Sequence, residues 1–442
     1  MNSSTEFDSR FARTFARHYP LLLGFVALLP FVVYRTTLAK LLWFGDDWDL
    51  VGQIDRVGLW TWIAKPWVES YSPLFKLVWG GSVFVFRGSY LAMLGLVWIG
   101  HAVTMILFGY LLRVVGFGWI AVSTTIAVIA LTATNIETLC WSVQLSPLLA
   151  NLFLVAAVLL YCRQPRSVSA GTQVGIILCI TASALCYSRG VLTGVVLATM
   201  SLLPPHFGPD RTWPHRCLIA AGYLLPAVVV IGVILSVATG NQQAVVAGHL
   251  EKLSRMIEFG AWYFCLNPFY DLLQFTTWSP SLTWSLGAAK FTLVVFTLWH
   301  SRGLQRWLLV LLLVFDLGNA ALLGLGRYHT GLRATASSRY QYCALLATIP
   351  FVAYWVDALF HLVPRARQIR QVVAASLLAW LIIAQVRGWS APWVNAFVDW
   401  RGAQPRAMLF SGKPLPADYK VPGIPGLPPS VALELVKRYH LH

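Results

Sequence analysis

Apolar stretches of membrane-spanning length recur along nearly the whole chain, and they limit the fold to a bundle of transmembrane helices. A segment of about 20 apolar residues is long enough to cross a bilayer. Of the 442 residues, 57% are hydrophobic and 11% are charged, whereas a soluble protein carries about 25% charged residues. We predict an all-α, polytopic transmembrane bundle of about 11 spans, at residues 19–39, 90–113, 118–134, 146–162, 172–187, 191–203, 217–238, 284–299, 307–325, 340–357 and 372–386.

Basic connections orient these predicted spans. Cytoplasmic loops of membrane proteins carry an excess of Lys and Arg. If the N-terminus is cytoplasmic, every short cytoplasmic connection is basic and nearly free of acid: these connections hold Arg163 and Arg166, Arg211 and Arg216, Arg302 and Arg306, and Arg365, Arg367 and Arg370. We therefore predict a cytoplasmic N-terminus and an extracytoplasmic C-terminus.

This topology divides the chain into three parts. Residues 1–18 form the cytoplasmic N-terminus, and the span that follows them is expected to stay attached as a signal anchor. Residues 19–386 form the transmembrane domain, whose outer loop 40–89 is expected to contain interfacial helices. Residues 387–442 form a short, irregular, extracytoplasmic tail that holds eight of the 23 prolines, with a closing helix at Val431–Tyr439.

The outer loop 40–89 concentrates the few carboxylates of the chain. It holds five of the 17 acidic residues, namely Asp46, Asp47, Asp49, Asp55 and Glu69. A carboxylate beside a reacting hydroxyl can accept its proton, and carboxylate oxygens also suit a divalent cation such as Mg²⁺ or Mn²⁺. We predict Asp46 and Asp47 as catalytic residues, and as the ligands if such a cation is bound. The alternative is that the pair caps a helix from 47 to about 56, with Asp46 as N-cap.

Six tryptophans surround this acidic cluster: Trp43, Trp48, Trp60, Trp62, Trp67 and Trp79. Indole rings favour the headgroup region of a bilayer, where one edge stays wet while the ring is buried. We therefore expect the acidic site to lie at the bilayer surface.

A basic outer stretch near the end of the bundle lacks balancing acids. Arg327, Arg333 and Arg339 lie within residues 326–340, which contain no carboxylate. Phosphate is the obvious counter-charge for guanidinium groups at a membrane surface. We predict a phosphate site here, with Arg189 at another outer turn as a further contact. The alternative is unspecific binding of anionic lipid headgroups.

Further polar residues lie in or between the predicted spans, and most of them allow two interpretations. Glu137, in the outer turn after the third span, faces the same side as Asp46 and is either a supporting acid or a solvated turn residue. Asp316 and Asn319 share one face of a late span. An intramembrane Asp is a functional hypothesis by default, but a structural hydrogen bond to Arg or Ser of a neighbouring helix is an equal alternative. His101, in the middle of a span, is expected to be a packing residue.

Taken in order, these elements resemble the GT-C superfamily of polytopic glycosyltransferases, which use polyprenyl-phosphate-linked sugars. The resemblance covers roughly residues 20–160 and 320–357. Its motifs are an acidic start of the first outer loop, a Pro-Leu element before a histidine-bearing span, an Asn-x-Glu with a nearby Trp, and a Gly-Arg followed by Ser-Arg-Tyr. In this chain they are Asp46-Asp47-Trp48, Ser72-Pro73-Leu74-Phe75 with His101, Asn135-Ile136-Glu137 with Trp141, and Gly326-Arg327 with Ser338-Arg339-Tyr340.

The resemblance implies an inverting transfer of a sugar from a polyprenyl-phosphate donor to a glycan, lipid or protein acceptor. Asp46 would be the base and Asp47 its partner or a cation ligand. The residues implied to hold the lipid phosphate are Arg327, Arg333, Arg339, Tyr340 and Arg189. It also implies a bacterial inner membrane with the active site facing the periplasm or exterior. Ser188-Arg189 stands where related sequences often show another acid, so metal dependence stays open.

Two other functions remain open at this stage: a transporter or flippase for lipid-linked glycans, and an outer-face glycan polymerase or ligase. A transporter would favour charges at the bilayer midplane. No P-loop, GxSxG, HExxH or Rossmann fingerprint is present, and we expect the lipid bilayer but no nucleic acid as a partner. The glycosyltransferase prediction requires that the first-loop aspartates and the distant arginines share one pocket on the non-cytoplasmic side.

Overall fold

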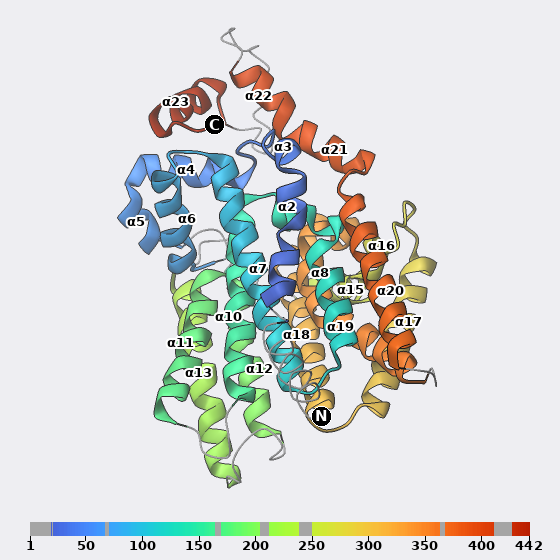
Figure 1. Ribbon diagram of the computed structural model, residues 1–442. Coiled ribbons are helices and arrows are strands. Elements are labelled where there is room, and N and C mark those ends of the chain that lie inside the picture. Colours follow the sequence, from blue (N-terminus) through green and yellow to red (C-terminus); the bar gives the residue numbers. More distant parts are fainter. Residues whose placement is uncertain are drawn as a thin grey trace, which may run out of the picture.

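The computed structural model describes residue 19 and residues 21–66, 70–163, 169–203, 212–237, 250–362, 367–410 and 427–442. All regular elements in these ranges are helices, which confirms the predicted all-α class. Upright helices packed side by side form the body of the molecule (Figure 1). They are α7 (Tyr90–Val114), α8 (Trp119–Leu131), α10 (Leu145–Cys162), α11 (Ala170–Cys186), α12 (Val191–Leu202), α13 (Trp213–Val237), α15 (Leu250–Leu266), α17 (Pro280–His300), α18 (Gly303–Arg327), α19 (Ser338–Leu362) and α20 (Arg367–Gly388).

Six helical segments in the described ranges are long and apolar enough to cross a membrane; they correspond to α7, to α10 with the turn before it, to α13, to α17, to α18 with the turn after it, and to α19. A seventh span results if Trp119–Leu131 and Ala133–Leu139, bent by 47°, count as one. The predicted count of about 11 is not confirmed. Four predicted spans correspond to apolar helices of 10–17 residues, and a 17-residue helix is only about 26 Å long, less than the ~30 Å hydrocarbon core. These four are the predicted spans 19–39, 172–187, 191–203 and 372–386.

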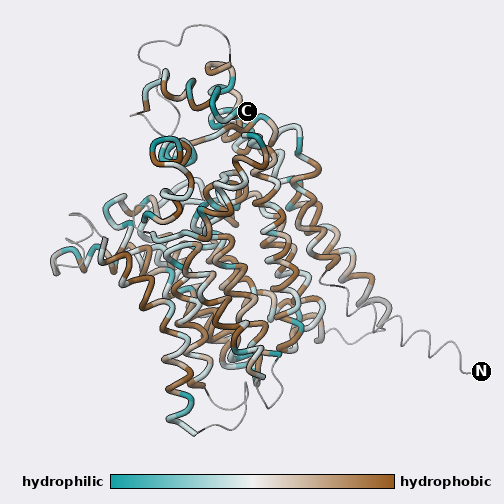
Figure 2. Tube along the Cα trace, turned by 90° about the vertical axis from the view of Figure 1, so that its left-hand side faces the viewer, coloured by the Kyte–Doolittle hydropathy of each residue, from teal (hydrophilic) through white to brown (hydrophobic). Residues whose placement is uncertain are grey.

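The outer surface of the body is apolar. Leu218 and Val228 of α13 are 70% and 62% exposed, and Phe291 of α17 is 65% exposed. Figure 2 shows hydrophobic residues along the length of the body helices, with hydrophilic residues gathered mainly toward their ends. Large apolar patches of this kind mark surfaces that face lipid or a partner rather than water. The protein is therefore membrane-embedded.

A layer of short helices covers one end of the body (Figure 1). We call this layer the cap, and the chain enters it through α2 (Leu29–Val33) and α3 (Arg35–Leu38). Loop 40–89 and the tail both contribute to it, which confirms that this loop contains helices. The cap consists of α4 (Asp46–Val57), α5 (Leu59–Ala64), α6 (Pro73–Val85), α21 (Pro392–Val398), the π-helical turn η7 (Asp399–Ala403), α22 (Gln404–Leu409) and α23 (Pro429–Tyr439).

The start of α4 depends on a glycine. Gly45 is the N-cap and Asp46 the first helical residue, so the alternative in which Asp46 caps the helix is wrong. Gly45 has a φ of +55°, a conformation that favours glycine. A Cβ at this position would also lie 3.1 Å from the ring of Trp141. The chain therefore turns sharply here and brings two successive carboxylates to the first turn of α4.

The tryptophans of the first loop are mostly core residues rather than headgroup anchors. Four of the six are at most 1% exposed: Trp43, Trp48, Trp62 and Trp79. Their N–H groups find partners inside the protein, as when Trp48 Nε1 donates to the Trp43 carbonyl at 2.8 Å. Trp60 is 75% exposed, while Trp67 and Glu69 lie outside the described residues. The expectation of wet indoles is wrong for the four buried rings because each buries a large apolar area beneath the loop.

The tail is helical where the structure describes it, so the predicted irregular tail is wrong for residues 387–410 and 427–442. Its prolines begin helices instead of breaking them: Pro392, Pro405 and Pro429 occupy the first or second position of α21, α22 and α23. The missing N–H of proline has no intrahelical partner at such positions, so it costs nothing there. The predicted closing helix at 431–439 is confirmed as α23.

The end of the tail docks on loop 40–89. Arg438 of α23 forms an ion pair with Asp55 of α4, with 2.6 Å between Nη1 and Oδ1. Two backbone hydrogen bonds follow, from His442 N to Gly88 O at 3.1 Å and from Tyr90 N to His442 O at 2.9 Å. The first and last parts of the described chain are thus joined in one layer.

A substitution of Gly402 tests whether η7 packs on residues 40–41, because a Cβ at this position would collide with the backbone of Lys40 and Leu41. We expect Gly402→Ala to lower the free energy of unfolding by about 1–3 kcal/mol, measured as a lower thermal midpoint in detergent. Gly81→Ala is the control, since its Cβ would meet nothing within 4 Å. An unchanged midpoint in Gly402→Ala would show that η7 does not pack on residues 40–41.

Candidate functional site

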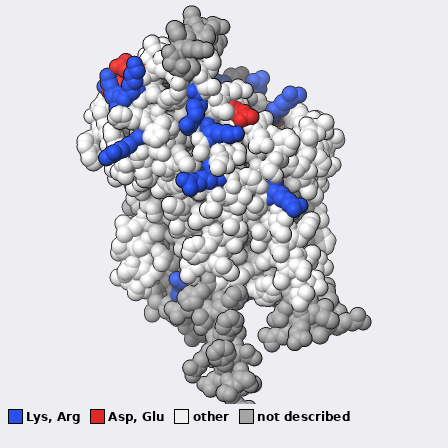
Figure 3. Space-filling model, turned by 45° about the horizontal axis from the view of Figure 1, so that its top comes forward, with Lys and Arg blue, Asp and Glu red and all other residues white. Residues whose placement is uncertain are grey.

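A cavity of about 200 Å³ lies where the cap meets the body. Figure 3 turns this end of the molecule forward and shows Lys and Arg side chains outnumbering Asp and Glu on its surface. The walls come from segments far apart in the sequence: the start of α4, the connection into α10, the turn η3 (Ser188–Gly190), the end of α18 and the start of α19. The residues that line it are Asp46, Ser70, Trp141, Val143, Gln144, Ser146, Pro147, Tyr187, Ser188, Arg189, Arg327, Arg339 and Tyr340.

The structure brings together most of the residues that the sequence analysis selected. Five of them line the cavity, namely Asp46, Arg189, Arg327, Arg339 and Tyr340. Three others do not line it, namely Asp47, Glu137 and Arg333. The predicted meeting of the first-loop aspartate with the distant arginines in one pocket is therefore observed, while the chemical role of each residue stays a prediction.

Asp46 presents its carboxylate to the cavity from the first turn of α4. The side chain is accessible, yet the protein around it displaces much of its water. Burial raises the pKa of Asp46 above 3.8, the positive charge of Arg339 acts against this rise, and the nearby Asp49 adds to it. A carboxylate with a raised pKa is a stronger proton acceptor than an ordinary aspartate, which suits the predicted base.

Asp47 lies behind the wall of the cavity and is 0% exposed. Ser142 Oγ donates to its Oδ1 at 2.7 Å, and the backbone N–H of Phe44 and the hydroxyl of Tyr90 donate to its Oδ2 at 3.2 and 3.4 Å. Burial raises its pKa to about 7, against the effect of the hydrogen bonds from Ser142 and Phe44. Its oxygens are thus occupied by protein donors, and the predicted pair Asp46 and Asp47 does not converge on one space.

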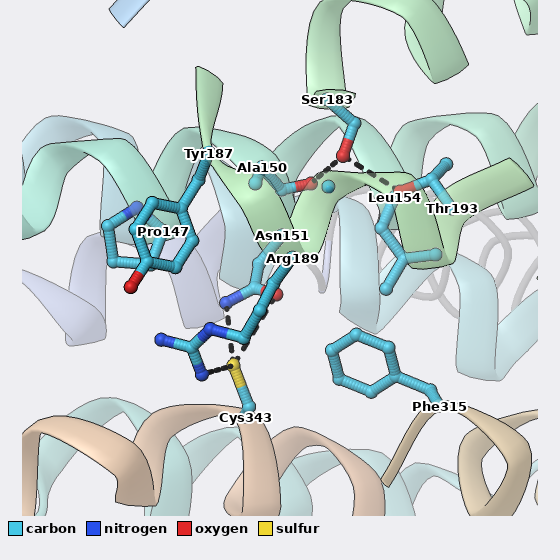
Figure 4. A pocket seen from close by; sticks show the side chains of 11 residues that line it. Pro147, Ala150, Asn151, Leu154, Ser183, Tyr187, Arg189, Thr193, Phe315 and Cys343 are labelled. Atoms are coloured by element: carbon cyan, nitrogen blue, oxygen red, sulfur yellow. Dashed lines mark hydrogen bonds between the residues drawn. The ribbon is translucent and has the colours of Figure 1, made fainter. Parts of the chain in front are cut away.

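Arg189 is held in the cavity wall by residues of the body. Its Nη1 donates to Asn319 Oδ1 at 2.9 Å and to Cys343 Sγ at 3.4 Å, and its guanidinium lies 5.0 Å from the ring centre of Tyr187. Figure 4 shows the smaller pocket beside it, of about 10 Å³, which shares Pro147, Tyr187 and Arg189 with the main cavity. That volume suits about one water molecule. Arg189 therefore forms the inner end of the cavity.

Arg339 and Tyr340 enter the cavity from the first turn of α19. The Arg339 guanidinium lies 5.0 Å from the ring centre of Tyr340, which orients both side chains. Arg327 reaches the same space from the last residue of α18. Arg333 instead lies exposed on η6 (Leu332–Ala336), outside the cavity. Of the arginines predicted to bind phosphate, Arg189, Arg327 and Arg339 thus line the cavity, whereas Arg333 does not.

Glu137 is not a solvated turn residue, because it binds the segment that carries Arg339. Its Oε2 accepts hydrogen bonds from Ser337 Oγ and Ser338 Oγ, both at 2.9 Å, and from the backbone N–H of Arg339 at 3.1 Å. Its Oε1 accepts one from Arg401 Nη2 at 3.0 Å. A carboxylate at the N-terminus of a helix also interacts favourably with the helix dipole. Glu137 therefore supports the site from behind rather than lining it.

Asp316 and Asn319 have different partners. Asp316 forms a buried ion pair with Lys290 of α17, at 2.6 Å, and the two side chains are 2% and 1% exposed. Lys290 Nζ also donates to the Asn267 carbonyl at 2.7 Å. Asn319 receives the hydrogen bond of Arg189. Both belong to structural networks, although the partner of Asp316 is a lysine and not the expected Arg or Ser.

His101 has protein partners on both ring nitrogens, which agrees with the expected packing role. Its Nδ1 lies 2.9 Å from the hydroxyl of Tyr342, and its Nε2 lies 3.2 Å from the carbonyl of Ala130. The hydrogen bonds join α7 to α8 and α19. His101 does not line the cavity.

Two charged residues were missed by the sequence analysis. Lys290 lies inside the predicted span 284–299, and an intramembrane lysine is itself a signal of a buried partner or a functional site. Arg401 is only 3% exposed and connects the tail to Glu137. No sequence pattern distinguishes Arg401 from a surface arginine of the tail, since its burial depends on how the tail docks.

No protein-family model matches this chain, and neither a curated protein nor a solved structure matches it. The resemblance to the GT-C superfamily therefore rests on the motifs of the sequence itself. The geometry of the cavity has to carry the functional interpretation.

The pH dependence of stability tests the environment of Asp47. Because burial raises its pKa from 3.8 to about 7, the folded state binds this proton more tightly than the unfolded chain. The resulting stabilisation is complete below the unfolded pKa and is lost as the pH rises through the folded one. We expect the thermal midpoint to fall between about pH 4 and about pH 7, and Asp47→Asn to make this slope shallower because the amide does not titrate.

Asp399→Asn, at an exposed position of the tail, is the matched control and should keep the slope of the unsubstituted protein. If Asp47→Asn also keeps it, Asp47 is not the group that titrates.

Proposed function

We propose that this protein is an integral membrane glycosyltransferase of the GT-C type. It transfers a sugar from a polyprenyl-phosphate donor to a glycan, lipid or protein acceptor, with inversion at the anomeric carbon. We place the cavity on the periplasmic or exterior side of a bacterial inner membrane. The positive-inside rule supports this side: α10 begins at the cavity and ends near Arg163, while α18 begins near Arg302 and ends at the cavity.

The observation that carries the proposal is the composition of the cavity. One accessible carboxylate, Asp46, shares it with three guanidinium groups, those of Arg189, Arg327 and Arg339. A base and a set of phosphate ligands are the two components that a polyprenyl-phosphate sugar transferase needs at opposite sides of one reacting carbon. Holding both in one cavity supplies the orientation on which such a reaction depends.

The proposed step proceeds as follows. The Asp46 carboxylate accepts the proton of the acceptor hydroxyl, and the hydroxyl oxygen bonds to the anomeric carbon of the donor. The bond between that carbon and the phosphate oxygen breaks on the opposite side, and its electron pair leaves with the lipid phosphate. Arg339, Arg327 and Arg189 stabilise the negative charge that develops on this leaving group.

Polar atoms in the wall support a bound ligand. Arg339 Nε, Arg189 Nε, the Tyr340 hydroxyl and the Ser70 hydroxyl are buried without a hydrogen-bond partner among the described residues. All four side chains line the cavity. Buried polar groups in native proteins are nearly always paired, so these atoms suit an oxygen-rich ligand such as a sugar phosphate.

The described lining residues do not fit a divalent cation site. Asp46 is the one carboxylate among them, and three guanidinium groups occupy the same space. No group of three or more His, Cys, Asp or Glu side chains in the described ranges is placed to hold a metal ion. We therefore assign the neutralisation of the phosphate to the arginines and derive no step through a metal.

A transporter of lipid-linked glycans is the second candidate, and the buried ion pair between Lys290 and Asp316 favours it. Charges inside a membrane bundle often mark a transport pathway. Lys290 Nζ, however, also donates to the carbonyls of Phe264 and Asn267, and neither member of the pair lines the cavity. A transporter would move its lipid-linked sugar intact, so the appearance of a transferred sugar in a product assay separates the two functions.

Substitution of Asp46 tests the proposed base. We expect Asp46→Asn to lower kcat roughly 100- to 10,000-fold, with donor affinity and thermal midpoint nearly unchanged. In the unsubstituted enzyme, kcat/KM should fall toward acid pH, because the base must be ionised, and its acid limb should lie above pH 3.8 because the pKa of Asp46 is raised. Transfer at the normal rate by Asp46→Asn would exclude Asp46 as the base.

Substitution of Arg339 tests the phosphate site. We expect Arg339→Met to weaken binding of a short-chain polyprenyl-phosphate hexose about 10- to 100-fold, because a hydrogen bond to a charged group contributes ~1.5–3 kcal/mol. Calorimetry in detergent measures the affinity. Arg333→Met is the matched control from the neighbouring turn, and it should bind normally because Arg333 lies outside the cavity. Equal losses in both variants would indicate unspecific attraction of the anion.

A further inference from the structure

We propose that Arg401, in the tail, is a positioning residue. It fixes the position of Asp46, on one side of the cavity, relative to that of Arg339, on the other. This inference rests on the proposed function for its kinetic consequences, but its structural part can be measured without any activity. Arg401 does not line the cavity, so it would act on the reaction through the residues that it contacts.

The first contact of Arg401 leads to Arg339. Its Nη2 lies 3.0 Å from Glu137 Oε1. The other oxygen of that carboxylate accepts the Ser337 and Ser338 hydroxyls and the backbone N–H of Arg339. A single carboxylate thus joins the tail to the first turn of α19. Movement of Arg401 would release the segment that aims the Arg339 guanidinium into the cavity.

The second contact leads to Asp46. The Arg401 guanidinium lies 4.1 Å from the ring centre of Phe44 and 4.8 Å from that of Trp141. Phe44 precedes Gly45, the N-cap of α4, and Trp141 Nε1 donates to the Phe44 carbonyl at 3.0 Å. Trp141 also lines the cavity. The same guanidinium therefore packs against the two residues that fix the start of α4.

Arg401 lies in an environment that is unfavourable for a charged group, so stability alone does not account for an arginine at this position. Its side chain is 4% exposed, and its Nε and Nη1 have no hydrogen-bond partner among the described residues. A buried ion pair of this kind is often no more stable than an apolar replacement. Arg401 also lies on η7, a single π-helical turn, and such turns are rare and frequently occur at functional sites. These features favour a positioning role.

Arginine suits this position better than lysine. A planar guanidinium can stack on the rings of Phe44, Phe397 and Trp141 while it donates to Glu137. A lysine ammonium would keep the charge opposite Glu137 but would lose the stacked geometry. Arg401→Lys should therefore retain part of the positioning, whereas Arg401→Met should retain none.

Hydrogen exchange followed by mass spectrometry tests the structural part on the full-length protein in detergent. We expect Arg401→Met to raise the exchange rate roughly tenfold in peptides covering 337–340 and 44–48, because the contacts that order these segments are lost. Arg401→Lys should give an intermediate rise. Arg406→Met is the matched control: Arg406 also binds the first loop, through a 3.2 Å hydrogen bond to the Leu41 carbonyl. It should leave both segments unchanged.

Transfer kinetics of the same variants test the functional part. Arg401→Met should lower kcat roughly 10- to 100-fold, the cost of a small misplacement of reacting groups, and should alter the KM for the donor much less. Arg401→Lys should recover part of kcat, and Arg406→Met should react normally.

The outcomes separate this inference from the proposed function. Unchanged exchange at 337–340 in Arg401→Met would overturn the positioning role, whatever the transfer rate. So would a rise in exchange without loss of kcat. If exchange rises but the unsubstituted protein transfers no sugar, the structural coupling stands and the glycosyltransferase proposal fails.

Discussion

The carboxylate of Glu137 is the interaction on which the arrangement of the cavity depends. It accepts one hydrogen bond from Ser337, which precedes α19, two from the first turn of α19 and one from Arg401. These donors belong to segments more than sixty residues apart, and the carboxylate itself lies in a third segment. Hydrogen bonds to a buried charge are strong, and leaving such a charge unpaired is expensive. The hydrogen bonds of Glu137 therefore connect the tail to the start of α19, and they position Arg339 in the cavity.

The bilayer explains why hydrophilic residues gather toward the ends of the body helices (Figure 2). Charged groups are costly within the hydrocarbon region unless they are paired. Inside the bundle, the buried charges of Lys290 and Asp316 are indeed paired with each other. At the cap, guanidinium groups can reach water and the phosphates of lipids. A lipid-linked donor is confined to the same depth, because its chain stays in the bilayer while its phosphate remains at the surface. The phosphate of the proposed donor would thus arrive near Arg327 and Arg339, which line the cavity at this end.

The sequence predicted the class of fold and the meeting of Asp46 with Arg339, because both follow from local patterns: apolar stretches of spanning length, and charges placed on one side of them. It did not predict the number of long spans, because short apolar stretches were counted as spans: the predicted span 191–203 corresponds to α12, which is only 12 residues long. Of the tail helices, α23 was predicted but α21 and α22 were missed, because proline usually breaks a helix whereas Pro392 and Pro405 begin these two. The burial of Arg401 depends on how the tail packs against the rest of the protein, and local sequence patterns do not predict this packing.

Two neighbouring aspartates show how strongly the fold separates residues that look equivalent in the sequence. Successive residues of a helix point in directions about 100° apart. Asp46 is therefore turned toward the cavity and Asp47 toward the core, where Ser142 and Tyr90 surround it. Burial raises the pKa of both carboxylates, but only the one in the cavity can meet an acceptor hydroxyl. In the proposed mechanism Asp46 is therefore the one base of the pair, while Asp47 anchors the helix that presents it.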